Sequence, residues 1–162
     1  MAIVDYFLNI DGIPGESTDA KYKGEIQLNS FSIGESNSST LGSATGGAGA
    51  GKVSFQDFNF TTKFSKASPK LMLACATGKH IPSAVMTARK SGGQGGGFEF
   101  LVVKLTTVLV NSIHSQGTDT VPEDAVSLAF AKIEVDYKEQ KPIGALGATT
   151  SFVWTLAENK AV

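Results

Sequence analysis

The chain has 162 residues, of which 41% are hydrophobic and 18% charged, and its formal net charge is −1. This length supports one domain, 1–162, with its own core, and the composition excludes a disordered chain. Acidic and basic residues are mixed along the sequence, so nothing indicates the basic surface that binds nucleic acid.

The N-terminus and the cysteine content bear on the compartment. Residues 1–6 lack the basic start and apolar run of a cleaved signal peptide, and no stretch has the roughly 18 apolar residues of a membrane span. Cys75 is the only cysteine, so no intramolecular disulfide can form. We therefore expect a protein without a membrane anchor, which uses no cleaved signal if it is exported.

Alternating apolar residues predict strands over much of the first 64 residues. Val4–Ile10 is the first of them and ends at the turn-like residues 11–15. Lys23–Gly34 and Val53–Phe64 are longer, and in both the apolar set changes parity, near Asn29 in the first case. Such a change predicts a bulge or bend in the strand.

The next segment has helix signals. Ser68 is a good N-cap with a proline after it, and Gly78 stands where a left-handed residue ends a helix. The spacing predicts a helix of about two and a half turns, with Leu71, Met72 and Cys75 on its apolar side.

Three further strands complete the predicted fold. Phe98–Ile113 is long enough to bend or divide, Ala125–Tyr137 changes parity, and Ser151–Leu156 places Phe152 and Trp154 on one face. Long strands with parity changes indicate a curled sheet. We predict a mainly β fold, a curled two-sheet β-barrel with one short α-helix and a long extended loop.

That loop is Asn37–Gly51, which consists almost wholly of Ser, Gly, Ala and Thr; a second, Gly-rich loop covers 91–97. A segment of this length without core-forming side chains is usually functional or disordered. We expect its partner to be another chain.

Several sequence features resemble reactive sites but lack a residue or a structural context that such sites require. Gly46–Lys52 has P-loop spacing, but Val53 replaces the required Ser or Thr and begins a strand instead of a helix. Cys75 is interpreted as a small core residue and His80 as a residue at the helix end. With His114 as the only other histidine, a metal cluster is not expected.

The carboxylates do not single out a catalytic pair. They fall in turns or alternate outward on a strand: Asp11, Glu16, Asp119, Glu123, Asp124, Glu134 and Asp136. We predict no catalytic, cofactor-binding or metal residue, and a protein that is not an enzyme.

Segments in order along the whole chain resemble the haemolysin-coregulated protein (Hcp) family, the tube proteins of the type VI secretion system. The matching segments are Gly51–Val53 followed by Gln56–Thr61, Leu71–Pro82, Arg89-Lys90 with Phe98–Phe100, Val108–Ser112, Val135–Tyr137, Gln140-Lys141 and Trp154.

The resemblance implies a barrel of two sheets flanked by a short helix, in a protein similar in fold to phage tail-tube proteins. It implies hexameric rings that stack into a tube, which a contractile sheath propels behind a spike protein and which can carry small effectors. It also implies residence in the bacterial cytoplasm followed by type VI secretion without a cleaved signal. We expect no cofactor and no C-terminal toxin domain, since the chain ends soon after Trp154.

Two sets of residues are then candidates for assembly. The stacking contact between rings is assigned to the long loop, at Ser38, Ser39, Thr40, Leu41, Gly42, Ser43, Gly46 and Gly47. The channel lining is assigned to Ser32 and Ser30, which have the opposite parity to Phe31 and Ile33. Ser32 is the stronger candidate because Ser30 sits at the expected bulge; both serines could equally face solvent or a neighbouring subunit.

The alternatives are a β-barrel that binds a small apolar ligand in its interior, a phage-type tail-tube protein and, third, a hydrolase. A ligand-binding barrel needs an unfilled cavity, whereas ten phenylalanines along the strands favour a filled core. The hydrolase lacks a nucleophile-elbow sequence.

Overall fold

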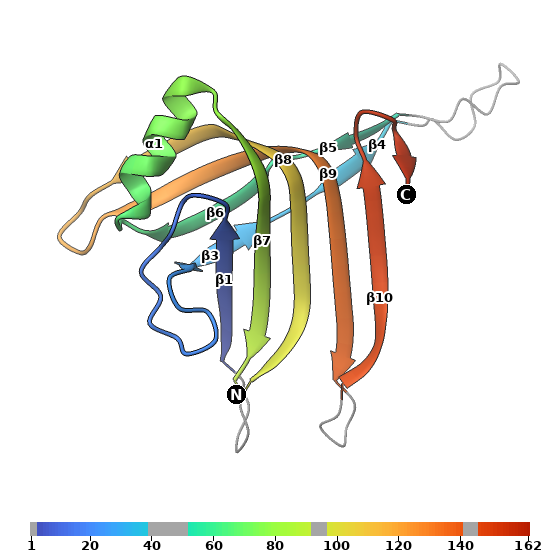
Figure 1. The fold of residues 1–162 in the computed structure, drawn as a ribbon, viewed down its shortest axis with the longest axis horizontal. Helices are drawn as coiled ribbons and strands as arrows, with labels where there is room; N and C mark the ends of the chain where they lie inside the picture. Colours follow the sequence, from blue (N-terminus) through green and yellow to red (C-terminus); the bar gives the residue numbers. More distant parts are fainter. Residues whose placement is uncertain (1–2, 39–51, 92–96, 141–145) are drawn as a thin grey trace, which may run out of the picture.

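The computed structural model describes residues 3–38, 52–91, 97–140 and 146–162. Strands dominate them and one helix is present, which confirms the mainly β prediction (Figure 1). The elements are β1 (Val4–Ile10), β2 (Ile26–Leu28), β3 (Ser30–Ser32), β4 (Glu35–Asn37), β5 (Val53–Phe55), β6 (Phe58–Lys63), α1 (Ala67–Thr77), β7 (His80–Lys90), β8 (Phe98–Gln116), β9 (Glu123–Gln140), β10 (Leu146–Thr155) and β11 (Lys160–Ala161).

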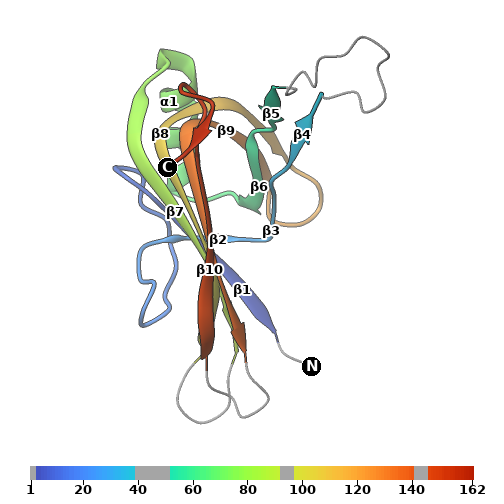
Figure 2. The same ribbon diagram turned by 90° about the vertical axis from the view of Figure 1, so that its right-hand side faces the viewer.

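The main sheet has the order β11-β10-β9-β8-β7-β1-β2, and all its ladders are antiparallel. β9 is shared by two layers, because its first half pairs with β6 and its second half with β10. β6 in turn pairs with β3, which follows β2 after the single residue Asn29. The sheet therefore curls back on itself through this bend, without closing into one continuous ladder (Figures 1 and 2).

The predicted parity changes are confirmed. Ile26 and Leu28 are buried from β2, the chain breaks register at Asn29, and Phe31 then packs against the core from the opposite parity. A buried side chain on alternate residues fixes which face of a strand is inside, so each change of parity bends the strand. Phe58 and Phe60 show the same effect after β5.

Side chains fill the space between the two layers. The largest fully buried ones come from nearly every long element: Phe7, Leu8, Ile10, Ile26, Phe58, Phe60, Leu71, Ile81, Met86, Val103, Leu105 and Leu128. This filled interior argues against the alternative of a barrel that holds a ligand inside.

The helix begins two residues earlier than predicted. α1 starts at Ala67 with Lys66 at the N-cap position, so the assignment of Ser68 as N-cap is wrong. The Ser68 hydroxyl lies inside the first turn, where it accepts a hydrogen bond from the Ser65 backbone N–H at 3.0 Å and donates one to Asp124. The predicted end is confirmed, because Gly78 has φ 63° and its N–H reaches the Cys75 carbonyl.

Asp124 holds the helix against the sheet. Its carboxylate is fully buried and accepts hydrogen bonds from the hydroxyls of Ser68 and Ser115, the latter at 2.6 Å. These bonds join α1 to β8 and β9. Buried carboxylates need such partners, so Asp124 has a structural role that its polar neighbourhood in the sequence does not reveal.

The buried side of α1 consists of Ala67, Ser68, Leu71 and Ala74. Cys75 is half-buried against the core, whereas Met72, predicted on the apolar side, is 37% exposed. None of the helices in the described ranges has the length and apolarity needed to cross a membrane.

Candidate functional site

One outward face of the molecule is built from small polar side chains. It belongs to the four adjacent strands β3, β6, the first half of β9 and the last part of β8. Direct cross-strand partners lie on the same face of a sheet, so the register fixes its composition. Two of its rows are Ser30, Thr61, Ala125 and His114, and Ser32, Asn59, Ser127 and Ser112, and the next row on the same side is Lys63, Glu123 and Gln116. We call the eight residues of the first two rows the small-polar face.

The two serines predicted to line a channel are part of this face. Ser30 and Ser32 are exposed and Phe31 between them packs inward, so their predicted direction away from the core is confirmed, whereas Ile33, expected inside with Phe31, is 39% exposed. The hydroxyls of Ser30 and Thr61 are 2.6 Å apart, and the Ser127 hydroxyl donates to the amide oxygen of Asn59. All eight residues line one shallow hollow of about 270 Å³.

This four-stranded layer has two open edges. β3 pairs with β6 on one side, and in the described part of the chain no strand pairs with its other side. β8 pairs with β7 only as far as Leu109, opposite His80, while its ladder with β9 continues to Gln116. Residues 111–116 of β8 therefore also lack a second neighbouring strand within the described ranges. Open edges of this kind are templates for pairing with another chain.

The predicted stacking loop connects a two-stranded arm. β4 and β5 pair through Glu35↔Phe55, Ser36↔Ser54 and Asn37↔Val53, and they extend away from the body (Figure 2). Ser38 is exposed at the end of this arm, and its hydroxyl donates to the Lys52 carbonyl at 3.5 Å. Ser39, Thr40, Leu41, Gly42, Ser43, Gly46 and Gly47 lie outside the described residues.

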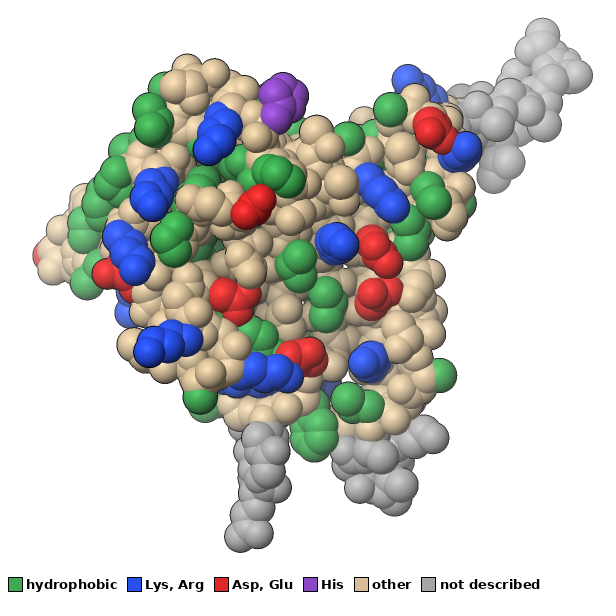
Figure 3. All heavy atoms as spheres, viewed as in Figure 1, with side chains coloured by type: hydrophobic (Ala, Val, Ile, Leu, Met, Phe, Trp, Pro, Cys, Tyr) green, Lys and Arg blue, Asp and Glu red, His purple; other side chains and the backbone are tan. Residues whose placement is uncertain are grey.

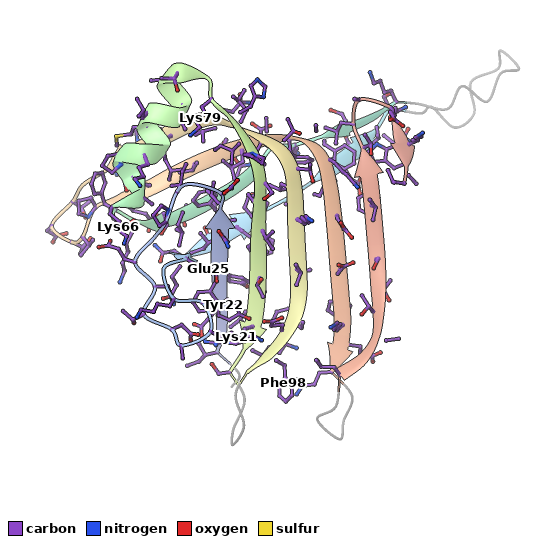
Figure 4. All side chains as sticks on the ribbon, in the orientation of Figure 1. Lys21, Tyr22, Glu25, Lys66, Lys79 and Phe98 are labelled. Carbon is purple, nitrogen blue, oxygen red and sulfur yellow. The ribbon has the colours of Figure 1, made fainter. Side chains whose placement is uncertain are left out.

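A charged cluster holds the segment between β1 and β2 against the sheet. The Arg89 guanidinium donates two hydrogen bonds to the Asp19 carboxylate, at 3.1 and 2.5 Å, and lies 5.1 and 5.2 Å from the ring centroids of Phe7 and Tyr22. The Arg89 hydrogen bonds, aided by the Lys21 backbone N–H, lower the pKa of Asp19 to about 2. Burial, reinforced by the hydrogen bond that the hydroxyl donates to Glu99, raises the pKa of Tyr22. Figure 4 shows Lys21, Tyr22 and Glu25 along this segment beside β1.

The structure does not assemble a reactive site from the residues considered in the sequence. Cys75 is on α1, His80 is exposed at the start of β7, and His114 belongs to the small-polar face. Among the described residues, no group of three or more His, Cys, Asp or Glu side chains is arranged to hold a metal ion. The feature that the geometry does show is the small-polar face between two open edges, bordered by Lys63 and Glu123.

Comparisons with known proteins agree with this geometry. Residues 7–137 match the family described as "Type VI secretion system effector, Hcp". Protein hcp1 of Pseudomonas aeruginosa is 41% identical over 160 residues, which cover 96% of this chain and 97% of that protein. The crystal structure of Hcp1 from Salmonella typhimurium superposes with a TM-score of 0.82 at 32% identity and covers 100% of both chains.

A second solved structure, of a type six secretion system protein, has a TM-score of 0.88 at 28% identity over 99% of this chain and 100% of that one. Sequence and fold therefore agree over essentially the whole length. The chain belongs to the Hcp family and is a subunit of the type VI secretion tube.

Proposed function

We propose that this chain forms a head-to-tail hexameric ring whose channel is lined by the small-polar face, and that rings stack into the tube. The observation that carries this proposal is the pair of open edges that flank the small-polar face. A ring of identical subunits needs two different patches, one on each side of the subunit. Pairing the β3 edge of one copy with the β8 edge of the next would continue the same sheet around the ring.

The strand directions are compatible with this pairing. The ladders β3–β6, β6–β9 and β9–β8 are all antiparallel, so the two edge strands β3 and β8 run in opposite directions. A junction between adjacent copies would then be antiparallel, like every other ladder of the layer. Each subunit supplies both edges, so a closed ring leaves neither exposed.

The chemistry of the face suits a channel. Five of its eight side chains carry a hydroxyl, and the other three are the Asn59 amide, the His114 imidazole and the Ala125 methyl, so none is a carboxylate or an ammonium group. Such a surface is wetted by water, and its eight side chains offer a cargo hydrogen bonds and no carboxylate or ammonium group. We assign Ser32 and Ser30 to the channel wall and small effectors to its cargo.

The arm and the 37–51 segment are assigned to stacking. The segment connects β4 to β5, the paired strands of the arm that extends away from the body (Figure 2). Its composition offers no side chains for a core of its own, which supports a partner chain as its contact.

The remaining partners follow from the family. We propose that the tube carries a spike protein at its tip, is driven by a sheath, and leaves the bacterial cytoplasm through the type VI system without a cleaved signal. We assign the chain no catalytic role, no cofactor and no nucleic acid or membrane partner.

Light scattering and negative-stain microscopy of the purified protein test the ring. We expect the mass of six subunits and uniform rings with a central hole. A monomer over the whole micromolar range would contradict the proposal.

Replacing residues 38–51 by a short Gly-Ser turn tests the stacking role. We expect unchanged thermal unfolding and unchanged rings, but loss of tube growth and secretion, because the contact between rings is removed. Normal polymerisation of the shortened protein would show that stacking uses another surface.

A further inference from the structure

An apolar groove opens where β9 changes its pairing partner from β6 to β10. The side chains of Phe130 and Val135 on β9, Phe152 on β10 and Phe55 on β5 line it, together with Ile33 just after β3. Its volume is about 330 Å³. The aromatic rings are in mutual contact, with Phe55 6.2 Å from Phe130 and 6.4 Å from Phe152 between centroids. A solvent-facing groove with this lining is typical of a docking surface.

One side chain gives the groove a charge. Glu35, the first residue of β4, is part of the lining and is exposed. The occupant should therefore present an apolar side chain with a cation next to it.

The exposed side of α1 has this combination. Leu73 is 64% exposed, and Lys70 and Lys66 lie one and two turns before it on the same side of the helix. The helix sequence ASPKLMLACAT contains no acidic residue. Figure 4 shows Lys66 and Lys79 at its two ends, and Figure 3 shows hydrophobic and Lys side chains side by side over it.

The two surfaces lie at opposite ends of the subunit, as head-to-tail contacts require. α1 packs on β8, beside one open edge, whereas the groove begins at Ile33 directly after β3, the other open edge (Figure 1). The same pairing of β3 with β8 between neighbours would therefore bring the groove of one copy to the helix of the next.

We propose that the groove receives α1 of a second copy of this chain, with Leu73 among the aromatic rings and Lys70 beside Glu35. This inference rests on the proposed ring. It names a contact between neighbouring subunits that would stabilise the ring in addition to the pairing of β3 with β8.

Four variants test the contact: Leu73→Glu, Lys70→Glu, Glu35→Lys and the double exchange Lys70→Glu with Glu35→Lys. We expect L73E to raise the concentration for half-assembly at least tenfold and each single charge reversal to raise it severalfold. The double exchange should restore assembly, because each interface again pairs opposite charges. All three positions are exposed, so far-UV circular dichroism should be unchanged.

Two variants serve as matched controls. Ile3→Glu changes an equally exposed apolar residue directly before β1, and Lys138→Glu changes an exposed lysine on β9. Both should assemble like the wild type. If the wild type forms rings and L73E and the charge reversals do so equally well, the ring stands and this contact is overturned. A double exchange no better than the single variants would remove the Lys70–Glu35 pair. A monomeric wild type would overturn both proposals.

Discussion

β8 and β9 carry two outward faces of opposite character. The first half of β9 and the end of β8 contribute to the small-polar face. The other halves of the same strands carry Lys104, Lys132, Glu134, Asp136 and Lys138, which we call the charged face. Figure 3 looks onto β7–β10 and shows Lys and Asp or Glu side chains interspersed there.

The difference shows how one strand serves two surfaces. In β9 the buried parity runs through Val126 and Leu128 and then changes to Ile133, so the outward parity changes as well. Lys104 faces Glu134 across the charged face, and mixed charges keep such a surface soluble and unpaired. The eight residues of the small-polar face include no such charge pair.

The largest expected effect comes from the core beneath the small-polar face. Phe58 is fully buried and its ring neighbours are Phe31 and Phe60. Phe58→Ala should lower the free energy of unfolding by about 3–5 kcal/mol, because it leaves a cavity. Urea unfolding measures this, with Leu105→Ala, under the charged face, as the comparison at about 2–5 kcal/mol. If F58A lost less than about 1 kcal/mol of unfolding free energy while Leu105→Ala showed its full loss, the two faces would not share one packed core.

The Asp19–Arg89 pair should make stability depend on acid. The folded protein lowers the pKa of Asp19 from 3.8 to about 2, so this carboxylate stabilises the fold above pH 3.8 and the stabilisation disappears as the pH falls toward 2. Asp19→Asn should be less stable than the wild type at neutral pH, and the difference should shrink on acidification. Urea unfolding at several pH values measures it, with the exposed Asp11→Asn as control; a difference that does not vary with pH would contradict the assignment.

A smaller effect is expected on the charged face. Lys104→Glu places two carboxylates directly opposite each other at the Lys104↔Glu134 pair. Like charges in this position should cost about 0.2–1 kcal/mol of unfolding free energy, and less at high salt. Lys104→Gln is the control that removes the attraction without adding repulsion, and an equal loss for both variants would exclude the repulsion.

The smallest effect on stability, with a functional consequence, is expected at Ser32. Ser32→Gln changes no buried volume, so unfolding and ring formation should match the wild type, while recovery of a co-expressed effector should fall. Thr149→Gln, exposed opposite Lys138 on the charged side, is the control and should leave recovery unchanged. Equal recovery with both variants, in samples with confirmed rings, would remove Ser32 from the cargo surface.

Local patterns predicted most of the fold and part of the site. Val4–Ile10 has the predicted bounds, the bend at Asn29 follows from Ile26, Leu28 and Phe31, and Gly78 ends the helix as expected. These features depend on neighbours within a few residues. The direction of Ser30 and Ser32 was predictable for the same reason.

What the sequence did not reveal depends on distant contacts. Arg89 meets Asp19 across 70 positions, and Ser68 meets Asp124 across 56. The second of these explains the wrong N-cap, because a buried carboxylate fixes the Ser68 hydroxyl inside the first turn. The sharing of β9 between β6 and β10, which creates the groove, has no local signal either.

Trp154 gives the molecule a built-in optical reporter. It is the only tryptophan, and its ring lies 6.4 Å from both Phe55 and Phe152, two side chains that line the groove. Its indole nitrogen is enclosed and has no hydrogen-bond partner among the described residues. Occupation of the groove by a neighbouring helix would change the surroundings of this ring, so emission from Trp154 should follow ring assembly in unlabelled protein, in real time.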